Sequence, residues 1–199
     1  MRLEGRPCLV VGGGEVAVRK VRGLLAAGAR VRVVSPAFPR RPAGLVWARR
    51  RFRAADVRGA ALVFACTDDP ATNRRVALAC RARAIPVNVA DAPDLCSFQV
   101  PSVVRRGPLL LSISTGGASP ALARRLRSRV ARLLAEGYAA LAAEIGRLRR
   151  RALRELPDPA TRRRLLQRLA GAGVLAQLER RGLPAARRTL ARLWSEAVR

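Results

Sequence analysis

A glycine run between an apolar strand and an amphipathic helix most constrains how this 199-residue chain can fold. Pro7–Val11 is apolar, Gly12–Gly14 follow it, and Glu15–Ala27 has apolar residues at helical spacing. Gly28 is a predicted helix stop, and Arg30–Val34 alternates as a strand. A strand, glycine loop, helix and strand within about thirty residues predict a βαβ unit.

The next segments continue the alternation of strands and helices. Leu45–Ala48 is a predicted third strand, and Ala60–Cys66 is apolar enough to be buried on both faces. Thr67–Pro70 reads as a loop and helix N-cap with proline at the first helical position, followed by a helix over Thr72–Arg83. Ile85–Ala90 is the fifth strand. We therefore predict an α/β fold with a Rossmann-type doubly wound parallel sheet.

The pattern changes after residue 100. Two short strands are predicted at Pro101–Arg106 and Leu109–Ser114, and Ser119 is the expected N-cap of a long helix. The remaining residues read as helical, with breaks near Gly137, Pro157–Pro159, Gly171–Gly173 and Gly182–Pro184. We predict a Rossmann domain at 1–105, a dimerisation segment at 106–145 and a helical C-terminal domain at 146–199.

Charge and composition narrow the possible chemistry. The chain has a formal net charge of +27, and Lys20 is the one lysine among its 40 basic residues. This bias toward arginine is typical of a skewed nucleotide composition, so most arginines are interpreted as solvated faces. Binding of nucleic acid or of a polyanionic small molecule stays open. With no histidine, Ser–His catalysis, histidine-bound metals and an imidazole base are excluded.

The cellular setting is inferred from apolar runs and cysteines. The longest apolar runs are too short to cross a bilayer, and the N-terminus carries no signal-peptide pattern, so we expect a cytoplasmic protein with no membrane partner. The four cysteines, at positions 8, 66, 80 and 96, show no CxxC spacing. Reduced thiols are expected, with Cys8 and Cys66 as small core residues.

The glycine run predicts a dinucleotide site. In Gly12-x-Gly14-x-x-Ala17, Gly12 permits the tight turn, Gly14 lets the backbone approach a pyrophosphate, and Ala17 allows close helix–strand packing. The helix N-terminus beyond it presents N–H groups and a positive dipole end. One feature departs from the fingerprint, because no Asp or Glu ends the second strand to bind the ribose. Ser35 and the backbone of Pro36 and Ala37 must serve instead, so the motif does not decide between NAD and NADP.

Two further motifs are candidates for binding or catalysis. Asp91 comes just after the fifth predicted strand, at the edge where open α/β sheets bind ligands. It is a candidate general base or metal ligand, or else a turn residue. The Ser112–Pro120 stretch places hydroxyls and backbone N–H groups before a helix, which suits either an anion site or an ordinary glycine-rich helix entry.

Together these motifs resemble one family in order and spacing. The chain is similar to precorrin-2 dehydrogenases, the N-terminal module of siroheme synthases, over about residues 3–150 and more loosely beyond. We expect no fused methyltransferase domain, for which 199 residues leave no room. Four runs carry the resemblance: Val10–Lys20, Ala65–Asp69, Asn88–Phe98 and Ser114–Leu122.

The resemblance implies a function and a set of partners. Family members oxidise precorrin-2 to sirohydrochlorin with NAD⁺, and some also insert Fe²⁺ as ferrochelatases in sirohaem biosynthesis. They are homodimers that exchange their middle segment, and none of this requires nucleic acid. A reduced tetrapyrrole with many carboxylates also suits a basic cleft. Candidate carboxylate partners, each also readable as solvated, are Arg105, Arg106, Arg124 and Arg125.

The resemblance also assigns roles to individual residues. Asp91 matches the aspartate that handles substrate protons or the metal. Asp94 and Cys96 lie nearby in the sequence, and for each a structural role is favoured over a role as helper. Thr115 stands where the family has serine in its substrate loop and keeps the hydroxyl. The resemblance implies dinucleotide contacts at Glu15, Val16, Pro36 and Ala37. With the motif residues included, the predicted cofactor-binding residues are Gly12, Gly14, Glu15, Val16, Ser35, Pro36, Ala37 and Thr67, and the predicted substrate-binding residues are Ser114, Thr115, Gly116 and Gly117. No resident metal ligands are predicted.

A second class of function remains as an alternative. The arginine-rich helices from 147 to 199 would suit an NAD-responsive regulatory protein that binds nucleic acid. Against this, the basic residues form no clear recognition-helix pattern. The motifs around Asp91 and Thr115 would also have no purpose in such a protein.

Overall fold

The computed structural model describes residues 1–134 and 136–198, except the side chain of residue 136. The chain divides into two compact units, Met1–Val100 and Pro101–Arg199, which we describe separately. The predicted boundary at 105 falls inside a β-strand of the second unit, and the one at 145 falls inside a helix. The assignment of 106–145 to dimerisation stays a prediction.

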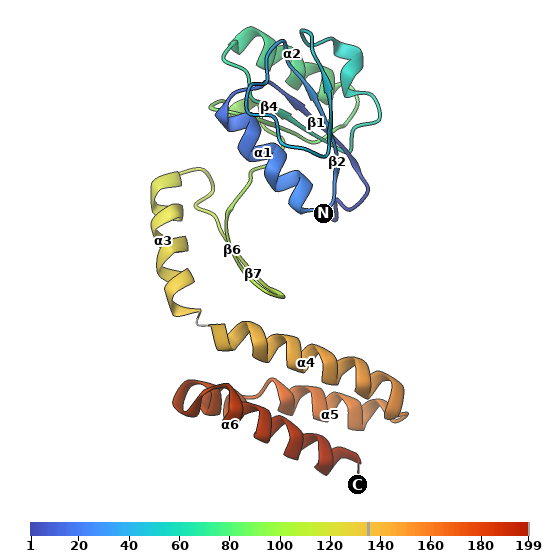
Figure 1. Cartoon of the computed structure of the whole chain (residues 1–199), viewed down its shortest axis with the longest axis vertical. Helices are drawn as coiled ribbons and strands as arrows, with labels where there is room; N and C mark the ends of the chain where they lie inside the picture. Colours follow the sequence, from blue (N-terminus) through green and yellow to red (C-terminus); the bar gives the residue numbers. More distant parts are fainter. Residues whose placement is uncertain (135, 199) are drawn as a thin grey trace. The chain divides into compact units, whose positions relative to one another are not determined.

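The first unit is built on a five-stranded parallel sheet (Figure 1). Its strand order is β3-β2-β1-β4-β5, and every neighbouring pair is parallel. This order confirms the predicted Rossmann-type sheet, in which the first strand lies at the centre. The strands are β1 (Pro7–Val11), β2 (Arg30–Val34), β3 (Leu45–Ala48), β4 (Leu62–Ala65) and β5 (Val87–Val89).

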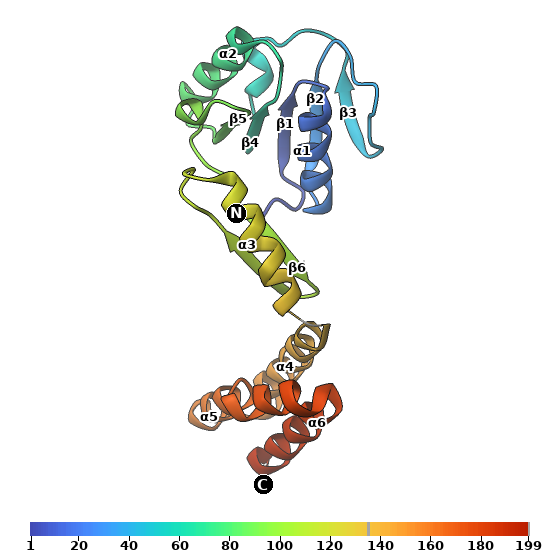
Figure 2. The ribbon, with the colours of Figure 1, turned by 90° about the vertical axis from the view of Figure 1, so that its left-hand side faces the viewer.

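The two faces of the sheet bury different side chains because successive residues of a strand point to opposite sides. On one face, Val10 and Phe64 pack in a core with α1 (Glu15–Ala26). On the other face, Leu9 and Val63 pack with α2 (Pro70–Arg81). Figure 2 shows the two helices on opposite sides of the sheet. The sheet is therefore doubly wound, as predicted.

Element ends follow local chemistry more than periodicity. Gly28, with φ of +74°, follows the end of α1 as expected. Helix α2 begins at Pro70, the predicted first helical position, with Asp69 as its N-cap, and it ends at Arg81, two residues before the predicted end at Arg83. Two short 3₁₀ turns that periodicity did not predict lie at Ala54–Val57 (η1) and Pro93–Leu95 (η2).

The second unit joins a hairpin to a helical bundle. Its strands β6 (Ser102–Arg106) and β7 (Leu109–Ile113) are antiparallel, and helix α3 spans Pro120–Leu133. Helices α4 (Glu136–Glu155), α5 (Pro159–Leu169) and α6 (Ala172–Val198) share a core that includes Leu165 and Leu190. The breaks between them lie near the predicted positions, and Gly182 kinks α6. In the described part of the chain, no helix combines the length and apolarity that crossing a bilayer requires.

Candidate functional site

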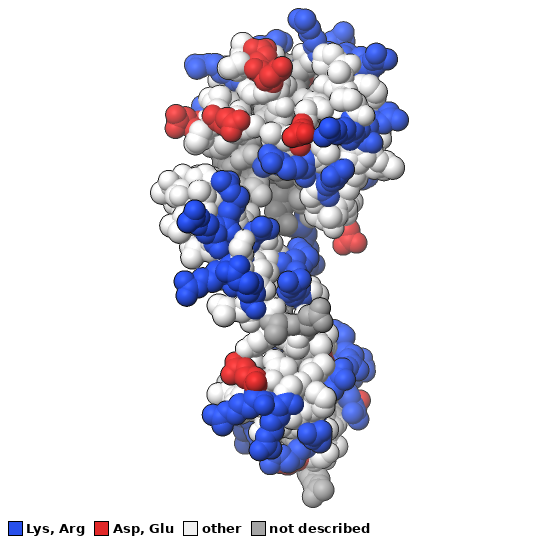
Figure 3. Space-filling model, turned by 60° about the vertical axis from the view of Figure 1, so that its left-hand side comes forward, with Lys and Arg blue, Asp and Glu red and all other residues white. Residues whose placement is uncertain are grey.

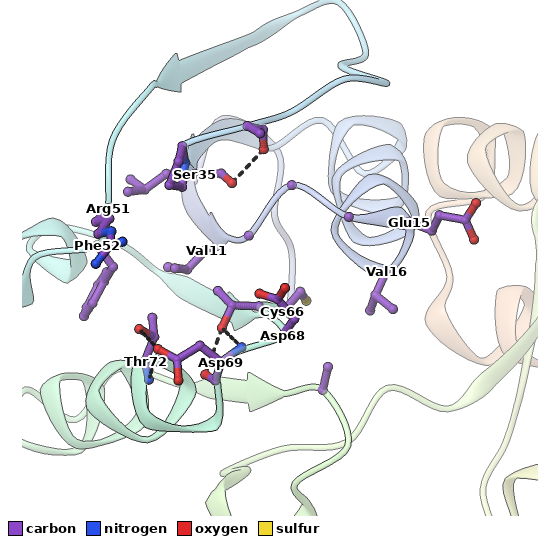
Figure 4. A pocket seen from close by; sticks show the side chains of 18 of the residues that line it. Val11, Glu15, Val16, Ser35, Arg51, Phe52, Cys66, Asp68, Asp69 and Thr72 are labelled. Carbon is purple, nitrogen blue, oxygen red and sulfur yellow. Dashed lines mark hydrogen bonds between the residues drawn. The ribbon is translucent and has the colours of Figure 1, made fainter.

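A cavity of about 820 Å³ opens beyond the carboxyl ends of the strands of the first unit (Figure 4). Parallel strands place their following loops at one edge, so residues far apart in sequence meet there. The residues predicted to bind the cofactor lie together in its lining, and so does the predicted catalytic residue. These are Gly12, Gly14, Glu15, Val16, Ser35, Pro36, Ala37, Thr67 and Asp91.

The first two glycines of the loop are needed for close backbone packing. Gly12 has φ of +117°, and a Cβ there would overlap the carbonyl of Cys66 at the end of β4. A Cβ on Gly13 would overlap the carbonyl oxygen of Ala37 in the loop after β2. Gly13 has no role in the dinucleotide motif predicted from the sequence. The glycine loop is therefore packed tightly between the segments that follow β4 and β2.

Gly14 differs because its free space faces no protein atom. A Cβ on Gly14 would meet nothing within 4 Å. Gly14 is the N-cap of α1, and no side chain caps this helix. The first-turn N–H groups of α1 and the positive end of its dipole therefore stay available at the cavity. An uncapped helix start beside a residue without a side chain fits the pyrophosphate of a dinucleotide.

The end of β2 shapes the side of the cavity where a ribose is expected. Ser35 is only 6% exposed, and its Oγ donates a hydrogen bond of 2.7 Å to the Ala37 carbonyl. Trp47 Nε1 donates to the Ser35 carbonyl over 2.9 Å, which fixes the backbone of the turn. The Ser35 hydroxyl proton is thus used within the loop.

The loop after β4 is held by a buried amide. Asn73, 7% exposed, accepts hydrogen bonds at Oδ1 from Thr67 N and Thr67 Oγ1, and its Nδ2 donates to the Thr67 carbonyl. Asp69 caps α2 through the N–H groups of Ala71 and Thr72. These bonds fix Thr67 at the cavity wall. Asn73 was missed from the sequence because it lies inside a helical pattern.

Asp91 stands exposed at the cavity edge two residues after β5. Its φ of +56° is left-handed, a conformation that Asp and Asn adopt more readily than other side chains. Among the hydrogen bonds found in the described part of the chain, none uses the Asp91 carboxylate. A carboxylate that is exposed and unengaged can accept a proton from a bound molecule.

Two further ionisable groups lie close to this edge. Burial raises the pKa of the Cys66 thiol to about 11, although Lys20 and Arg19 oppose the change. The thiol is therefore protonated near neutral pH, and Cys66 and Cys8 are core residues as predicted. Lys20 places Nζ 4.9 Å from the centroid of the Phe64 ring, and burial lowers its pKa.

Cys96 makes the structural contacts that the sequence favoured over a role as helper. Its sulfur accepts a hydrogen bond from Val89 N over 3.2 Å and donates to the carbonyls of Val89 and Ala92. These contacts tie η2 to β5. Asp94, its predicted companion, lies in η2 and is not in the cavity lining.

The predicted substrate loop belongs to the second unit. Ser114 Oγ accepts a hydrogen bond from Gly116 N, and Thr115 Oγ1 accepts one from Ser119 N over 3.0 Å. Gly116 and Gly117 have positive φ values of +63° and +91°. The loop is thus a closed turn ahead of α3, while the cavity described above is lined by first-unit residues alone.

The loop after β3 adds residues that the sequence analysis did not single out. Asp56 is 4% exposed and accepts two hydrogen bonds from the Arg50 guanidinium, at 2.8 and 2.6 Å. The bond from Arg50 holds the pKa of this carboxyl below its usual range. Arg51 and Phe52, next along the chain, line the cavity. An Asp in an arginine-rich loop was the available signal, but no periodicity pointed to it.

Comparison with known families matches both units. Residues 1–102 match the family of putative NAD(P)-binding proteins, which is about half of the chain. Residues 106–133 match the central segment of sirohaem biosynthesis proteins.

Curated relatives and a solved structure extend the match. The chain is 48% identical to a siroheme synthase of Thioalkalivibrio sulfidiphilus over 176 residues, covering 85% of the chain and 36% of the relative. It is 52% identical to one of Methylobacillus flagellatus over 149 residues, covering 72% and 32%. The chain thus spans about a third of the length of these relatives.

The structural likeness covers nearly the whole chain. SirC, a precorrin-2 dehydrogenase, superposes with a TM-score of 0.78 at 27% identity, covering 98% of this chain and 97% of SirC. The glycine loop, the uncapped α1 and the central segment agree with these matches. The chain belongs to the family of siroheme synthases and precorrin-2 dehydrogenases, with a putative NAD(P)-binding module followed by the central segment of sirohaem biosynthesis proteins.

Proposed function

We propose that this chain oxidises precorrin-2 to sirohydrochlorin with NAD⁺. The observation that carries the proposal is the uncapped N-terminus of α1, which opens on the same cavity as the free carboxylate of Asp91. The likeness to SirC supports the choice of substrate. The reaction removes a hydride and a proton from precorrin-2 and yields sirohydrochlorin, NADH and H⁺.

The first unit binds and orients the cofactor in this proposal. The backbone N–H groups at Gly14–Val16 receive the pyrophosphate, because no side chain of the described structure occupies them. Thr67, held by Asn73, forms the opposite wall. When bound, the nicotinamide supplies the hydride acceptor, and the protein supplies position and electrostatics.

Asp91 accepts the proton that precorrin-2 loses. Its side chain is exposed at the edge of the cavity, so it can reach a substrate without a structural change in the sheet. The chain has no histidine, which makes a carboxylate the available base at neutral pH.

The second unit is our candidate for binding the carboxylates of the substrate. Helix α3 carries five arginines and no acidic residue, and Figure 3 shows basic side chains gathered over this segment. All five are exposed: Arg124, Arg125, Arg127, Arg129 and Arg132. Arg105 and Arg106 on β6 are exposed as well. We assign the turn at Ser114–Gly117 to the same task and propose a homodimer.

An assay of the complete chain with precorrin-2 and NAD⁺ tests the proposal. We expect NADH absorbance to rise in step with sirohydrochlorin formation. Asp91→Asn keeps a residue that tolerates the left-handed backbone but cannot accept the proton. It should lower kcat by about a hundredfold or more, with NAD⁺ affinity unchanged.

Asp68→Asn is the matched control, because it removes another carboxylate from the same cavity lining. Its kcat should stay within about threefold of that of the parent, a much smaller change than the loss of a general base causes. Full activity in Asp91→Asn, or an equal loss in both variants, would contradict the role given to Asp91. Absence of NADH formation by the parent chain would contradict the proposed reaction.

Insertion of Fe²⁺ into sirohydrochlorin is a second proposed activity, favoured by the same free carboxylate. Metal insertion requires the pyrrole N–H protons to leave, and in this proposal Asp91, which lines the cavity, accepts them. Within residues 1–134 and 136–198, no cluster of three or more Cys, Asp or Glu side chains could hold a metal ion. Adding Fe²⁺ to the assay and following sirohaem separates the two activities. The expected cytoplasmic location stays a prediction.

A further inference from the structure

Arg51 is the one basic residue among the described residues that line the cavity. Four carboxylates share that lining: Glu15, Asp68, Asp69 and Asp91. Arg51 is exposed, and none of the ion pairs found among the described residues includes it. A single cation without a carboxylate partner is therefore available to a bound anion.

The backbone around Arg51 is held on both sides. Arg50 Nη1 donates to the Arg51 carbonyl over 3.1 Å and also to Asp56 Oδ2 over 2.8 Å. On the other side, Phe52 is 6% exposed and packs into the core between the sheet and α2. The backbone of Arg51 is thus held between the partly buried Arg50–Asp56 ion pair and the buried ring of Phe52. Figure 4 shows it on the wall of the cavity with Phe52.

Strand order separates Arg51 from most of the carboxylates. Arg51 follows β3, at one edge of the sheet, whereas Asp68 and Asp69 follow β4 and Asp91 follows β5. Two strands, β2 and β1, lie between these groups. The remaining carboxylate, Glu15, pairs with Arg40 over 2.9 Å. Arg51 therefore acts at the end of the cavity formed by β2 and β3.

In a Rossmann-type site, the adenosine ribose binds at the end of the cavity formed by β2 and β3. A carboxylate at the end of β2 selects a free 2′-hydroxyl, and an arginine nearby accommodates a 2′-phosphate. Here β2 ends at Val34 and Ser35 follows it, with its hydroxyl proton bonded to the Ala37 carbonyl. Asp68, Asp69 and Asp91 follow the distant strands β4 and β5, and Glu15 is paired with Arg40. No unpaired carboxylate of the lining therefore lies at this end to repel a phosphate, and Arg51 is there to pair with one.

We propose that this cavity accepts a 2′-phosphorylated dinucleotide as well as NAD, and that Arg51 binds the 2′-phosphate. The inference rests on the dinucleotide use proposed above. It adds that the chain binds NADP⁺ at least as tightly as NAD⁺. The turn held by Asp56 is part of this proposed 2′-phosphate site, because it fixes the backbone from which the Arg51 side chain extends.

Calorimetric titration of the complete chain with NAD⁺ and NADP⁺ tests this assignment. Arg51→Ala should weaken NADP⁺ binding by roughly tenfold to a hundredfold, because it removes a charge-assisted hydrogen bond. NAD⁺ binding should change less than about threefold, which is below the effect of one such bond. Arg51→Gln, which keeps much of the side chain, should give the same selective loss.

Arg58→Ala is the control for net charge, because Arg58 is exposed and lies outside the cavity lining. It should leave both affinities unchanged. Parent chain that binds NADP⁺ more weakly than NAD⁺, or not at all, would overturn this inference and leave the dehydrogenase proposal intact. Binding of neither dinucleotide would overturn both. Equal losses for the two dinucleotides in Arg51→Ala, or equal effects of Arg51→Ala and Arg58→Ala, would remove Arg51 from the role.

Discussion

Helices α1 and α2 begin beside each other at the same edge of the sheet, after the neighbouring strands β1 and β4, yet their first turns are used differently. Helix α2 is capped by Asp69, which accepts hydrogen bonds from Ala71 N, Thr72 N and Thr72 Oγ1. Helix α1 begins at Gly14 with no side-chain cap. The N-terminal N–H groups of α2 are therefore hydrogen-bonded within the fold, whereas those of α1 are available to a ligand.

The second unit follows the pattern of α2. Helix α3 is capped by Ser119, which accepts from Leu122 N, and α5 by Asp158, which accepts from Ala160 N and Thr161 N. The uncapped start of α1 therefore contrasts with three capped helices of the same chain. Since a side-chain cap typically stabilises a helix by about 1 kcal/mol, its absence at a cavity points to binding.

Gly12→Ala should have the largest effect, because it breaks the packing that brings the two helix starts together. A Cβ there would overlap the Cys66 carbonyl, and the φ of +117° is unfavourable for alanine. We expect the free energy of unfolding to fall by about 4 kcal/mol or more. Urea unfolding followed by circular dichroism measures the change.

Gly23→Ala is the control for this substitution. Gly23 lies within α1, where a Cβ would meet nothing within 4 Å. Alanine should therefore raise the free energy of unfolding by about 0.5–1 kcal/mol. Similar stabilities of the two variants would show that Gly12 is not constrained by β4.

Gly14→Asp should convert α1 into a helix that starts as α2 does. The new carboxylate can cap the free N–H groups and interact with the helix dipole, so the free energy of unfolding should rise by about 0.5 kcal/mol. The same carboxylate blocks and repels a pyrophosphate, and NAD⁺ affinity should fall by about a hundredfold or more. Thermal unfolding and calorimetric titration of one sample measure both quantities.

Gly14→Asp is thus expected to raise the free energy of unfolding while it lowers NAD⁺ affinity. Gly14→Ala separates these two effects, because its methyl group meets no protein atom and brings no charge. It should weaken NAD⁺ binding without stabilising the helix. Unchanged NAD⁺ affinity in Gly14→Asp would place the pyrophosphate elsewhere and remove the functional meaning of the comparison.

At this edge of the sheet, the features that could be predicted from the sequence are those set by short-range patterns. The glycine loop, the strand alternation and the cap at Thr67–Pro70 depend on neighbouring residues, so their positions could be predicted. The clamp on Gly13 could not, because its partner Ala37 lies 24 residues away in a loop without periodicity. Arg51 was missed for the same reason, since its place depends on the contact between Arg50 and Asp56.

Asp69→Ala should have the smallest effect. It tests whether the capped start of α2 serves the fold and not the ligand. Removing the cap of α2 should lower Tm by several degrees at pH 7 while NAD⁺ affinity stays close to that of the parent. The hydrogen bond from Thr72 lowers the pKa of Asp69 below its ordinary value of 3.8. Its stabilising contribution is therefore complete above that value and is lost as the pH falls through the folded-state pKa.

The difference in Tm between the parent and Asp69→Ala should accordingly be constant from pH 7 to pH 5 and shrink below about pH 4. Asp69→Asn is the matched variant, because asparagine caps helices about as well as aspartate but does not titrate. Its Tm should stay near that of the parent at neutral pH. A large loss of NAD⁺ affinity in Asp69→Ala would mean that α2 also serves the ligand, and that the two helix starts share one task.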